Sequence, residues 1–464
     1  MLNEVLAEVC RRYGARLAVA DRAQSLSYEE LASRAGNLAG QIPTGARVGL
    51  CATNSVDLVV AYAAVLRAGA VPFLVDRAMG PAELDHIIGS CALDLVVHDR
   101  PLPPDHRAGT SRAFGSHTLT PYSVAPRARL LDTTEVCRFT SGSTGFPQCI
   151  EFSGDAVHSA AANWMRGTGL GGDDRVLCYA GLSNGLAFNT SLLAVFLAGA
   201  SLHLATGLPA AGSVVRSISG TAATRLTGFP ALYDSLARRT PPPGTFADIR
   251  VAVSSGARLS TETAELLRER CGLHVSDYYG IAETGPLTFA TGQTGGLGAP
   301  LPGVGLRTGA GGELLVRSAS MGSRYHNAPG VFEAKLDADG YYRTGDLGHL
   351  DRGGLVLTGR ISHVLNVGGR KIDPIEVRRV LCELPGVDDA VVFGAAKPGG
   401  DDMVVAVVAS RAAVTAAELR TGCFERLAAF KVPERVHVVE TLPRNSIGKP
   451  TLAAVRAIAG VSEH

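Results

Sequence analysis

Short apolar strands alternate with longer Ala- and Leu-rich helices along most of the chain. Residues 47–51 (RVGLC) predict a strand, residues 56–68 a helix, and residues 93–99 (LDLVVHD) another buried strand. Strand-like runs separated by segments of helical length are typical of parallel sheets with helical crossovers. The fold class predicted is therefore α/β, built from layered β-sheets and helices.

The organisation changes near Thr358–Arg360, after the turn-rich segment DADGYYRTGDLGHLDRGG. Downstream lie one helical pattern (PIEVRRVLCEL) and two apolar strand patterns (DDAVVFG and MVVAVVAS), enough for a small separate core. We expect a large N-terminal domain over residues 1–359 and a small, mobile α+β lid over residues 360–464. The Pro-rich stretch 99–127 predicts a surface connection.

Composition excludes several classes of function. The 464 residues carry 44 Lys and Arg against 43 Asp and Glu, a net charge of +1. This balance gives no field that would attract nucleic acid or an anionic membrane. Apolar runs fall short of the ~18 residues that span a bilayer. We therefore expect no nucleic-acid or membrane partner, and a cytoplasmic protein. Nine cysteines without a C-x-x-C pair argue against a disulfide framework or a structural zinc site.

The strongest local motif is the segment Phe139–Pro147, FTSGSTGFP. Its small residues permit a tight turn, and its clustered N–H and hydroxyl groups can cradle phosphate oxygens. It is not a Walker A loop, because no Lys-Ser or Lys-Thr follows the last glycine. From composition alone, a plain loop between two strands is an equal alternative.

TSGSTGFP resembles the phosphate loop of the adenylate-forming superfamily, which includes acyl-CoA synthetases, aryl-CoA ligases, peptide-synthetase adenylation domains and luciferases. Further segments resemble the family's motifs in the family's order over nearly the whole chain: LSYEEL (26–31), LRAGAVP (66–72), YGIAET (279–284), GAPLPG (298–303), YRTGD (342–346), GR (359–360) and PRNSIGK (443–449). The resemblance implies that an acid attacks the α-phosphate of ATP to give acyl-AMP and pyrophosphate. A thiol then takes the acyl group.

The resemblance also implies catalytic residues. Glu283 would hold Mg²⁺, a cation that prefers carboxylate and phosphate oxygens. Thr284 would donate a hydrogen bond to the α-phosphate, and Lys449 would reach the reacting oxygens as a mobile positive charge. Taken singly, Glu283 is also compatible with an N-cap or a surface residue, and a lysine such as Lys449 is most often a solvated tail residue. In register with the other motifs, the catalytic interpretation is favoured.

A second implied set would bind the nucleotide. Asp346 would accept hydrogen bonds from the ribose hydroxyls, and Tyr279 would lie against the adenine. The whole ATP-binding set is Thr140, Ser141, Gly142, Ser143, Thr144, Gly145, Gly256, Ala257, Tyr279, Asp346 and Arg360. The glycine-rich loop at Gly368, Gly369 and Arg370 would lie near CoA.

Three positions depart from the family pattern. Gln148 stands where the phosphate loop usually has a lysine, so we expect weaker binding of ATP or pyrophosphate without loss of chemistry. His363 occupies the pivot position between the domains, and Asn366 replaces another lysine. Gln148 and Asn366 support the alternative of a degenerate homologue that binds nucleotide without catalysis. Retention of Glu283, Asp346 and Lys449 opposes it.

The acid substrate is indicated by residues 180–189, AGLSNGLAFN. Amino-acid-activating relatives usually place an aspartate here, and its absence argues against an α-amino acid. The segment is similar to that of benzoate-type aryl-CoA ligases. The residues expected to line the acid pocket are Asn184, Phe188, Phe229, Ser255, Gly280 and Ile281, with ordinary core packing as the alternative for both phenylalanines.

The function expected is ATP-dependent activation of an aromatic or small carboxylic acid, followed by transfer to a thiol, foremost that of CoA. The same chemistry would also load the phosphopantetheine of a carrier protein. A further alternative delivers the adenylate to a nitrogen nucleophile. The sequence leaves these acceptors open.

Overall fold

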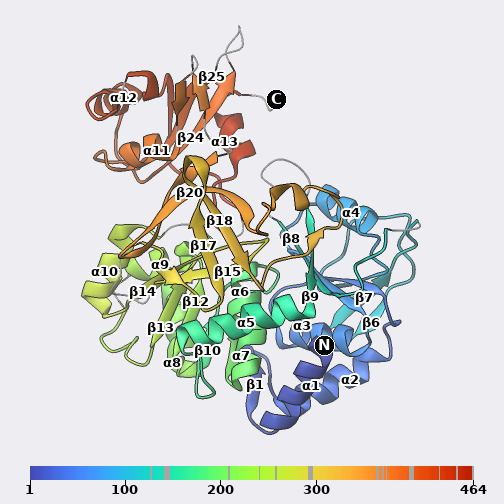
Figure 1. Ribbon diagram of the computed structural model, residues 1–464. Helices are drawn as coiled ribbons and strands as arrows, with labels where there is room; N and C mark the ends of the chain where they lie inside the picture. The colour runs from blue at the N-terminus through green and yellow to red at the C-terminus, as the bar shows by residue number, and fades with distance from the viewer. Residues whose placement is uncertain are drawn as a thin grey trace. The chain divides into compact units, whose positions relative to one another are not determined.

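A computed structural model describes most of the chain (Figure 1). The described residues are 1–125, 128–140, 147–206, 210–239, 241–256, 259–290, 296–361, 365–367, 370–372, 374–396, 402–427, 429–445 and 448–461. Contacts divide the chain into two compact units, Met1–Gly305 with Val316–Tyr342, and Leu306–Leu315 with Arg343–His464. The predicted α/β class is confirmed. The domain boundary at residues 359 and 360 stays a prediction, because the two compact units do not show at which residue one domain would rotate against the other.

The first unit contains a nine-stranded sheet with the order β16-β15-β14-β13-β12-β10-β11-β1-β2. Its centre, from β14 to β1, is parallel. The strands are β1 (Leu17–Ala20), β2 (Ser25–Ser27), β10 (Arg175–Cys178), β11 (Ser201–Leu204), β12 (Arg225–Gly228), β13 (Val251–Ser254), β14 (Val275–Ile281), β15 (Gly285–Phe289) and β16 (Ala299–Pro300).

An eight-stranded sheet follows the order β19-β9-β8-β4-β3-β5-β7-β6. It is parallel at β8-β4-β3-β5 and antiparallel towards both edges. The strands are β3 (Arg47–Cys51), β4 (Val71–Leu74), β5 (Leu95–His98), β6 (Arg112–Phe114), β7 (His117–Pro121), β8 (Thr134–Phe139), β9 (Cys149–Ser153) and β19 (Arg324–Tyr325).

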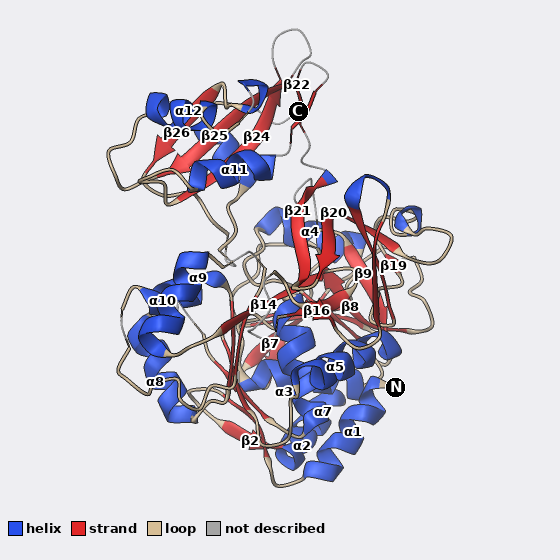
Figure 2. Cartoon of the chain, turned by 60° about the vertical axis from the view of Figure 1, so that its left-hand side comes forward, coloured by secondary structure: helices blue, strands red, loops and turns tan. Residues whose placement is uncertain are grey.

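Helices cover both sheets and fill the layer between them. Figure 2 shows α8 and α10 on one side of the nine-stranded sheet and α3, α5 and α7 on the other. The helices are α1 (Leu2–Tyr13), α2 (Tyr28–Ala39), α3 (Val56–Arg67), α4 (Pro81–Ser90), α5 (Gly154–Thr168), α6 (Gly185–Ala187), the π-helix η1 (Phe188–Leu192), α7 (Leu193–Ala198), α8 (Ala211–Thr221), α9 (Pro230–Ala237) and α10 (Thr261–Cys271).

Side-chain alternation along the strands explains these layers. On β10, Val176 and Cys178 belong to the central core, whereas Leu177 belongs to the core beneath α8, α9 and α10. On β8, Val136 faces the central core and Cys137 the core beneath α4. Because successive residues of a strand point to opposite faces, strands with apolar residues on both faces must be covered on both sides.

In the second unit, a four-stranded sheet has the order β17-β18-β20-β21, which explains why residues 306–315 group with later segments. A three-stranded sheet, β24-β25-β26, carries apolar cores on both faces, under α11 and α12 on one side and α13 on the other. The elements are β17 (Val304–Thr308), β18 (Glu313–Ser318), β20 (Tyr342–Asp351), β21 (Gly354–Arg360), β22 (Leu365–Val367), β23 (Arg370–Ile372), α11 (Pro374–Cys382), β24 (Asp389–Ala396), β25 (Asp402–Ala409), α12 (Ala416–Phe424), β26 (Arg435–Val439) and α13 (Leu452–Ile458).

The stretch expected to form a surface connection also contains regular structure. The Pro-rich stretch 99–127 contains the hairpin β6–β7, and β7 extends the eight-stranded sheet by pairing with β5. Pro121 is tolerated because it is the last residue of β7, where the ladder ends. The proline content therefore indicated turns correctly but concealed two short strands.

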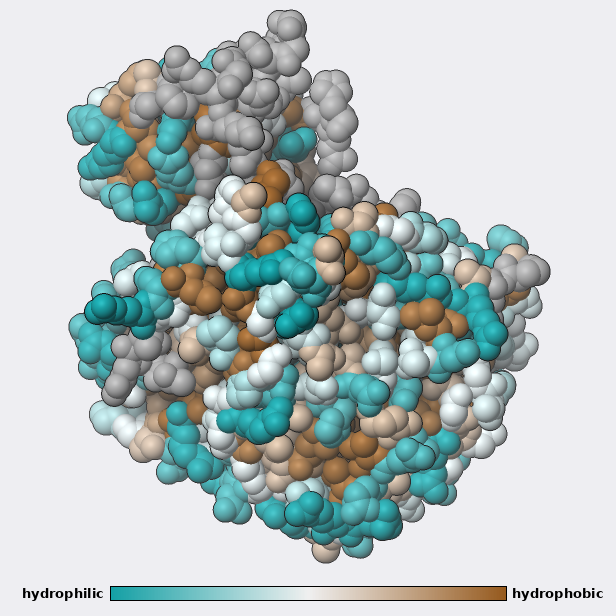
Figure 3. Space-filling model, in the orientation of Figure 1, coloured by the Kyte–Doolittle hydropathy of each residue, from teal (hydrophilic) through white to brown (hydrophobic). Residues whose placement is uncertain are grey.

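All nine cysteines are free thiols. Among the residues described, no helix combines the length and apolar character needed to cross a bilayer. On the face drawn in Figure 3, hydrophilic residues surround small, scattered hydrophobic patches.

Candidate active site

Predicted site residues gather at one edge of the nine-stranded sheet. The parallel strands β10, β12, β13 and β14 are neighbours, so their carboxyl ends lie together. Ligands of open parallel sheets bind at this edge. The residues that follow or end these strands are Asn184 and Phe188 after β10, Phe229 after β12, Ser255 and Gly256 after β13, and Tyr279, Gly280 and Ile281 on β14.

Two glycines at this edge permit close backbone approach. Gly256 has φ +88°, a left-handed conformation, and a Cβ there would lie 3.1 Å from the Phe229 ring. A Cβ at Gly280 would lie 2.5 Å from the Gly285 carbonyl oxygen. The Ser255 hydroxyl donates to the Tyr278 carbonyl at 3.1 Å, which ties the end of β13 to β14. Ala257 lies outside the described residues.

The turn between β14 and β15 carries Glu283 and Thr284. Tyr325 donates its hydroxyl hydrogen bond to Glu283 Oε1 at 2.6 Å. The Thr284 backbone is held by the Ser320 hydroxyl, which donates to its carbonyl at 2.7 Å, while its own hydroxyl is buried without a partner in the described part of the chain. Burial beside a carboxylate raises the pKa of Tyr325 far above its usual value, so the phenol stays a donor.

Asn184 and Phe188 have roles in local structure. Asn184 is the N-cap of α6, and its Oδ1 accepts from the Leu186 N–H at 2.9 Å. Phe188 is only 1% exposed and packs edge-on against Tyr62, with ring centroids 5.9 Å apart. In this structure Phe188 is therefore packed in the core, which was the alternative to a role in the acid pocket. Its ring lies on the core side of the sheet edge.

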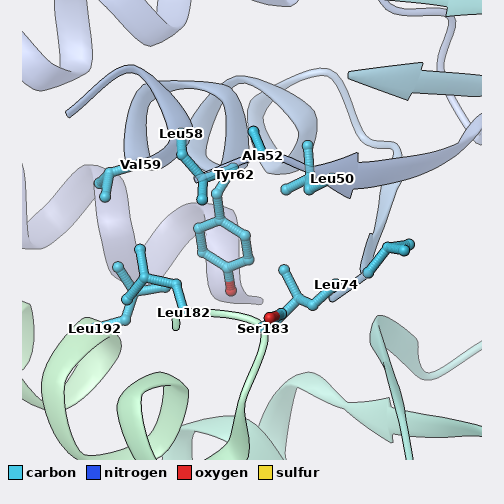
Figure 4. Close-up of a pocket in the computed structure, with 10 residues that line it drawn as sticks. Leu50, Ala52, Leu58, Val59, Tyr62, Leu74, Leu182, Ser183 and Leu192 are labelled. Carbon is cyan, nitrogen blue, oxygen red and sulfur yellow. The ribbon is translucent and has the colours of Figure 1, made fainter. Parts of the chain in front are cut away.

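Beside Phe188, a small apolar slot opens between α3 and residues 182–192 (Figure 4). The Tyr62 ring reaches into it from α3 and its hydroxyl points towards the segment that carries Leu182 and Ser183. The slot has a volume of about 10 Å³, room for about one water. It does not hold an aromatic acid in this conformation.

The phosphate loop is described only at its two ends. Thr140 and Gln148 face each other: the Thr140 N–H donates to the Gln148 carbonyl at 2.9 Å, and the Gln148 N–H donates to Thr140 Oγ1 at 3.2 Å. These bonds close the base of the loop. The predicted phosphate ligands Ser141, Gly142, Ser143, Thr144 and Gly145 lie outside the described residues.

In the second unit, Asp346 and Arg360 lie directly opposite one another on the antiparallel strands β20 and β21. Asp346 is 8% exposed, and its N–H donates to the Thr344 hydroxyl at 3.0 Å. The sequence placed both residues in the nucleotide site, and the structure brings their backbones together. Of the predicted CoA-binding residues, Arg370 begins β23, while Gly368 and Gly369 are not described.

Lys449 ends a short closed loop. Asn445 holds it on both sides: the Lys449 N–H donates to Asn445 Oδ1 at 2.9 Å, and the Asn445 N–H donates to the Lys449 carbonyl at 2.8 Å. Arg444 donates to the Gly448 carbonyl at 2.7 Å and pairs with Asp389 on β24. The loop's backbone is thus tied to the sheet of its own unit.

Two buried polar residues near this edge, on β8 of the eight-stranded sheet and on η1, were not predicted. Arg138, in the apolar strand that leads into the phosphate loop, is 4% exposed, and Asn189 on η1 is also 4% exposed. Arg138 donates to the Ala282 carbonyl at 3.2 Å. A lone cation within VCRF was the available signal, and sequence alone gave no reason to bury it.

A buried ion network supports the strand after the loop. Glu151 on β9 is 0% exposed and accepts from His326 Nδ1 at 2.9 Å and from Arg324 at 2.8 Å. Thr134 and the Leu131 N–H also donate to it. Burial opposes ionisation, but these donors outweigh it and lower the pKa of Glu151 to about 2.

Glu151→Gln is expected to lower the free energy of unfolding by about 3–5 kcal/mol, because it leaves buried donors without their anion. In the wild type, a depressed pKa contributes stability that is present above the unfolded pKa of about 4.3 and lost as the pH falls towards 2. Urea melts between pH 7 and pH 2.5 measure both effects. Glu8→Gln, at an exposed carboxylate paired with Arg11, is the control. Equal stability of the two variants at pH 7 would contradict this role for Glu151.

A solved structure has the same fold as this chain. The chain superposes on ATP-bound MatB of Rhodopseudomonas palustris with a TM-score of 0.84, covering 98% of both chains at 24% identity. The two chains therefore share one fold over nearly their whole length.

Sequence comparison gives the family. The profile of "AMP-binding enzyme" matches residues 6–326, and that of "AMP-binding enzyme C-terminal domain" matches residues 376–449. The chain therefore belongs to the AMP-binding enzyme family, and it is an AMP-forming acid–thiol ligase. Similar proteins include the anthranilate–CoA ligase of Pseudomonas aeruginosa (27% identical over 472 residues, 93% of this chain and 90% of the relative). The malonate–CoA ligase of Arabidopsis thaliana is 24% identical over 466 residues (87% and 76%).

Proposed function

We propose that this enzyme activates an aromatic or small carboxylic acid as acyl-AMP at the carboxyl edge of the nine-stranded sheet and transfers the acyl group to CoA. The observation that carries the proposal is the gathering of Phe229, Gly256, Tyr279 and Glu283 at that edge. The acids named for the similar ligases, anthranilate and malonate, support the substrate class.

In this proposal the adenine lies on the backbone of Gly256, where the missing side chain leaves a flat surface, and against Tyr279. Asp346 accepts from the ribose hydroxyls, and Arg360 adds positive charge near it. Thr140 and the phosphate loop hold the phosphates, and Thr284 donates to the α-phosphate. The orphaned Thr284 hydroxyl supports this role, because a buried donor without a partner is costly unless a ligand satisfies it.

Glu283 suits a magnesium ion. No cluster of three or more His, Cys, Asp or Glu residues that could hold a metal occurs among the described residues. Mg²⁺ is commonly held by one or two carboxylates together with substrate phosphates and waters, so a single carboxylate fits. Tyr325 occupies only one Glu283 oxygen and orients the group. When bound, the ion would neutralise phosphate charge.

Lys449 would supply the charge that carboxylate and α-phosphate need as they approach, since two anions repel. The carboxylate oxygen bonds to phosphorus and pyrophosphate leaves. In the second half-reaction a thiolate attacks the acyl carbon, and AMP leaves with that oxygen. We place CoA near Arg370.

Isotope transfer tests this route. With an acid labelled with ¹⁸O in its carboxylate, the AMP released in the presence of CoA should contain one ¹⁸O atom, measured by mass spectrometry. Thioester formation with unlabelled AMP would exclude attack of the carboxylate on the α-phosphate.

Gln148→Lys is expected to tighten ATP binding by about three- to tenfold, because it adds a positive charge where the family usually has one. The hydrogen bonds at the base of the loop fix the backbone of residue 148 at the loop's exit. Titration calorimetry with ATP measures the effect, with Gln148→Met as a control for side-chain length. Equal ATP affinity of Gln148→Lys and Gln148→Met would show that a positive charge at residue 148 does not strengthen ATP binding.

A further inference from the structure

Arg138 is a buried cation that makes no ion pair in the part of the chain that the structure describes, although Glu283 lies near enough to stabilise its charge through space. Within the described parts of the chain, no Asp or Glu carboxylate lies at ion-pair distance from its guanidinium, which donates only to the Ala282 carbonyl. Its Nε is buried without any hydrogen-bond partner. By contrast, the equally buried Arg225 pairs with Asp174 at 2.8 Å. An unpaired buried charge is strongly unfavourable. An anionic ligand that binds Arg138 would supply the missing ion-pair partner.

Aromatic rings hold the guanidinium in place. Its carbon lies 4.3 Å from the centroid of the Phe152 ring and 5.3 Å from that of Phe188. Contacts with ring faces offset part of the desolvation of a cation but leave its N–H edges free to donate. Burial lowers the pKa of Arg138 to about 10, so the group is still charged at neutral pH.

A second unpartnered donor lies beside it. Asn189 Nδ2, on η1, is buried and makes no hydrogen bond in the described structure. A Cβ added at Gly185 would lie 3.0 Å from an Arg138 terminal nitrogen and 3.8 Å from Asn189 Nδ2. Both donors therefore lie close to the Cα of Gly185. π-Helical turns such as η1 are frequent at functional sites. Donors that converge without an acceptor favour an anion.

We propose that Arg138 and Asn189 form a subsite for a second carboxylate of the acid substrate, so that the enzyme activates one end of a dicarboxylic acid. The subsite rests on the proposed function and narrows its substrate class. Its neighbours are the segments assigned to the acid: Phe188 stacks on Arg138, Gly185 follows Asn184, and Ala282 follows Ile281. Gly185 and Gly285 let the two donors lie close to the backbone, because a Cβ at Gly185 would lie 3.0 Å from an Arg138 nitrogen and one at Gly285 would lie 3.6 Å from Asn189 Nδ2.

The first test compares matched acids on the wild-type enzyme. Pyrophosphate release is measured with succinate and isophthalate, with the monomethyl ester of each, and with butyrate and benzoate. At least one diacid should exceed its own monoester in kcat/KM by about 100-fold or more, because a site built to pair a charged group rejects the analogue that lacks it. A diacid no better than its ester throughout the panel, while monocarboxylic acids react, would overturn the subsite.

Variants separate recognition from structural support. Arg138→Met should reduce the ratio of diacid to monoester kcat/KM by about 100-fold, and Arg138→Lys should restore part of it. Arg225→Met, which removes a buried arginine paired with Asp174, should leave this ratio unchanged. Equal loss on both substrates in Arg138→Met would overturn recognition and assign Arg138 to support of the Ala282 turn. Absence of pyrophosphate with every acid would instead overturn the proposed function itself.

Discussion

Lys449→Ala should slow formation of acyl-AMP by about 100- to 1,000-fold, because it removes a positive charge from a step in which two anions must approach. Transfer of the acyl group from supplied acyl-AMP to CoA should be nearly unaffected. The structure sharpens this expectation: Asn445 and Arg444 hold the loop through its backbone, so loss of the side chain leaves the loop in place.

Each half-reaction is measured separately, the first by pyrophosphate release and the second by thioester formation from acyl-AMP. Lys431→Ala is the matched control, since Lys431 lies in the same unit and pairs with Glu376 near the surface. It should change neither rate by more than a few-fold. Equal losses in both half-reactions of Lys449→Ala would show that the lysine acts on the fold of its unit.

Glu283→Gln should reduce the rate of adenylation by about 100-fold at fixed magnesium and raise the magnesium concentration needed for half-maximal rate. The amide keeps the size of the side chain and can still accept from Tyr325, so the turn between β14 and β15 should persist. Pyrophosphate release over a magnesium series at saturating ATP measures both changes.

Tyr325→Phe is the companion to that variant. It removes the hydrogen bond that orients Glu283 and leaves the carboxylate, so we expect only about a three- to tenfold loss. An unchanged magnesium requirement in Glu283→Gln would contradict metal binding by Glu283. A larger loss in Tyr325→Phe than in Glu283→Gln would make the phenol the more important group.

Much of the fold could be predicted because the local patterns agree with the tertiary structure. RVGLC forms β3 from Arg47 to Cys51, buried at every position, as expected of a central parallel strand. In LSYEEL, Ser27 and Glu30 form a capping box at the start of α2. The hairpin β6–β7 was missed because its pairing partner, β5, lies in another segment and proline dominates the local composition.

Sequence motifs supplied the candidate site residues, whereas contacts between distant segments could not be predicted. Family motifs led to Asp346 and Arg360, which the structure pairs on β20 and β21. Nothing in the sequence joins Glu151 to His326, or Tyr325 to Glu283, because those contacts depend on how the strands pack. Arg138 is the clearest example of a residue whose environment could not be predicted. An arginine within a strand is expected to be exposed, but here Phe188 of η1 covers it.

The most direct test of the central claim is pyrophosphate release on a panel of carboxylic acids, with mass spectrometry of the products with and without CoA. We predict that at least one aromatic or small acid gives acyl-AMP alone and its CoA thioester when CoA is present. Acyl-AMP that never passes to CoA would contradict the proposed acceptor and direct attention to a carrier protein or a nitrogen nucleophile. If no acid in the panel gives pyrophosphate, although the protein still binds ATP, the assignment as an acid–thiol ligase would be contradicted.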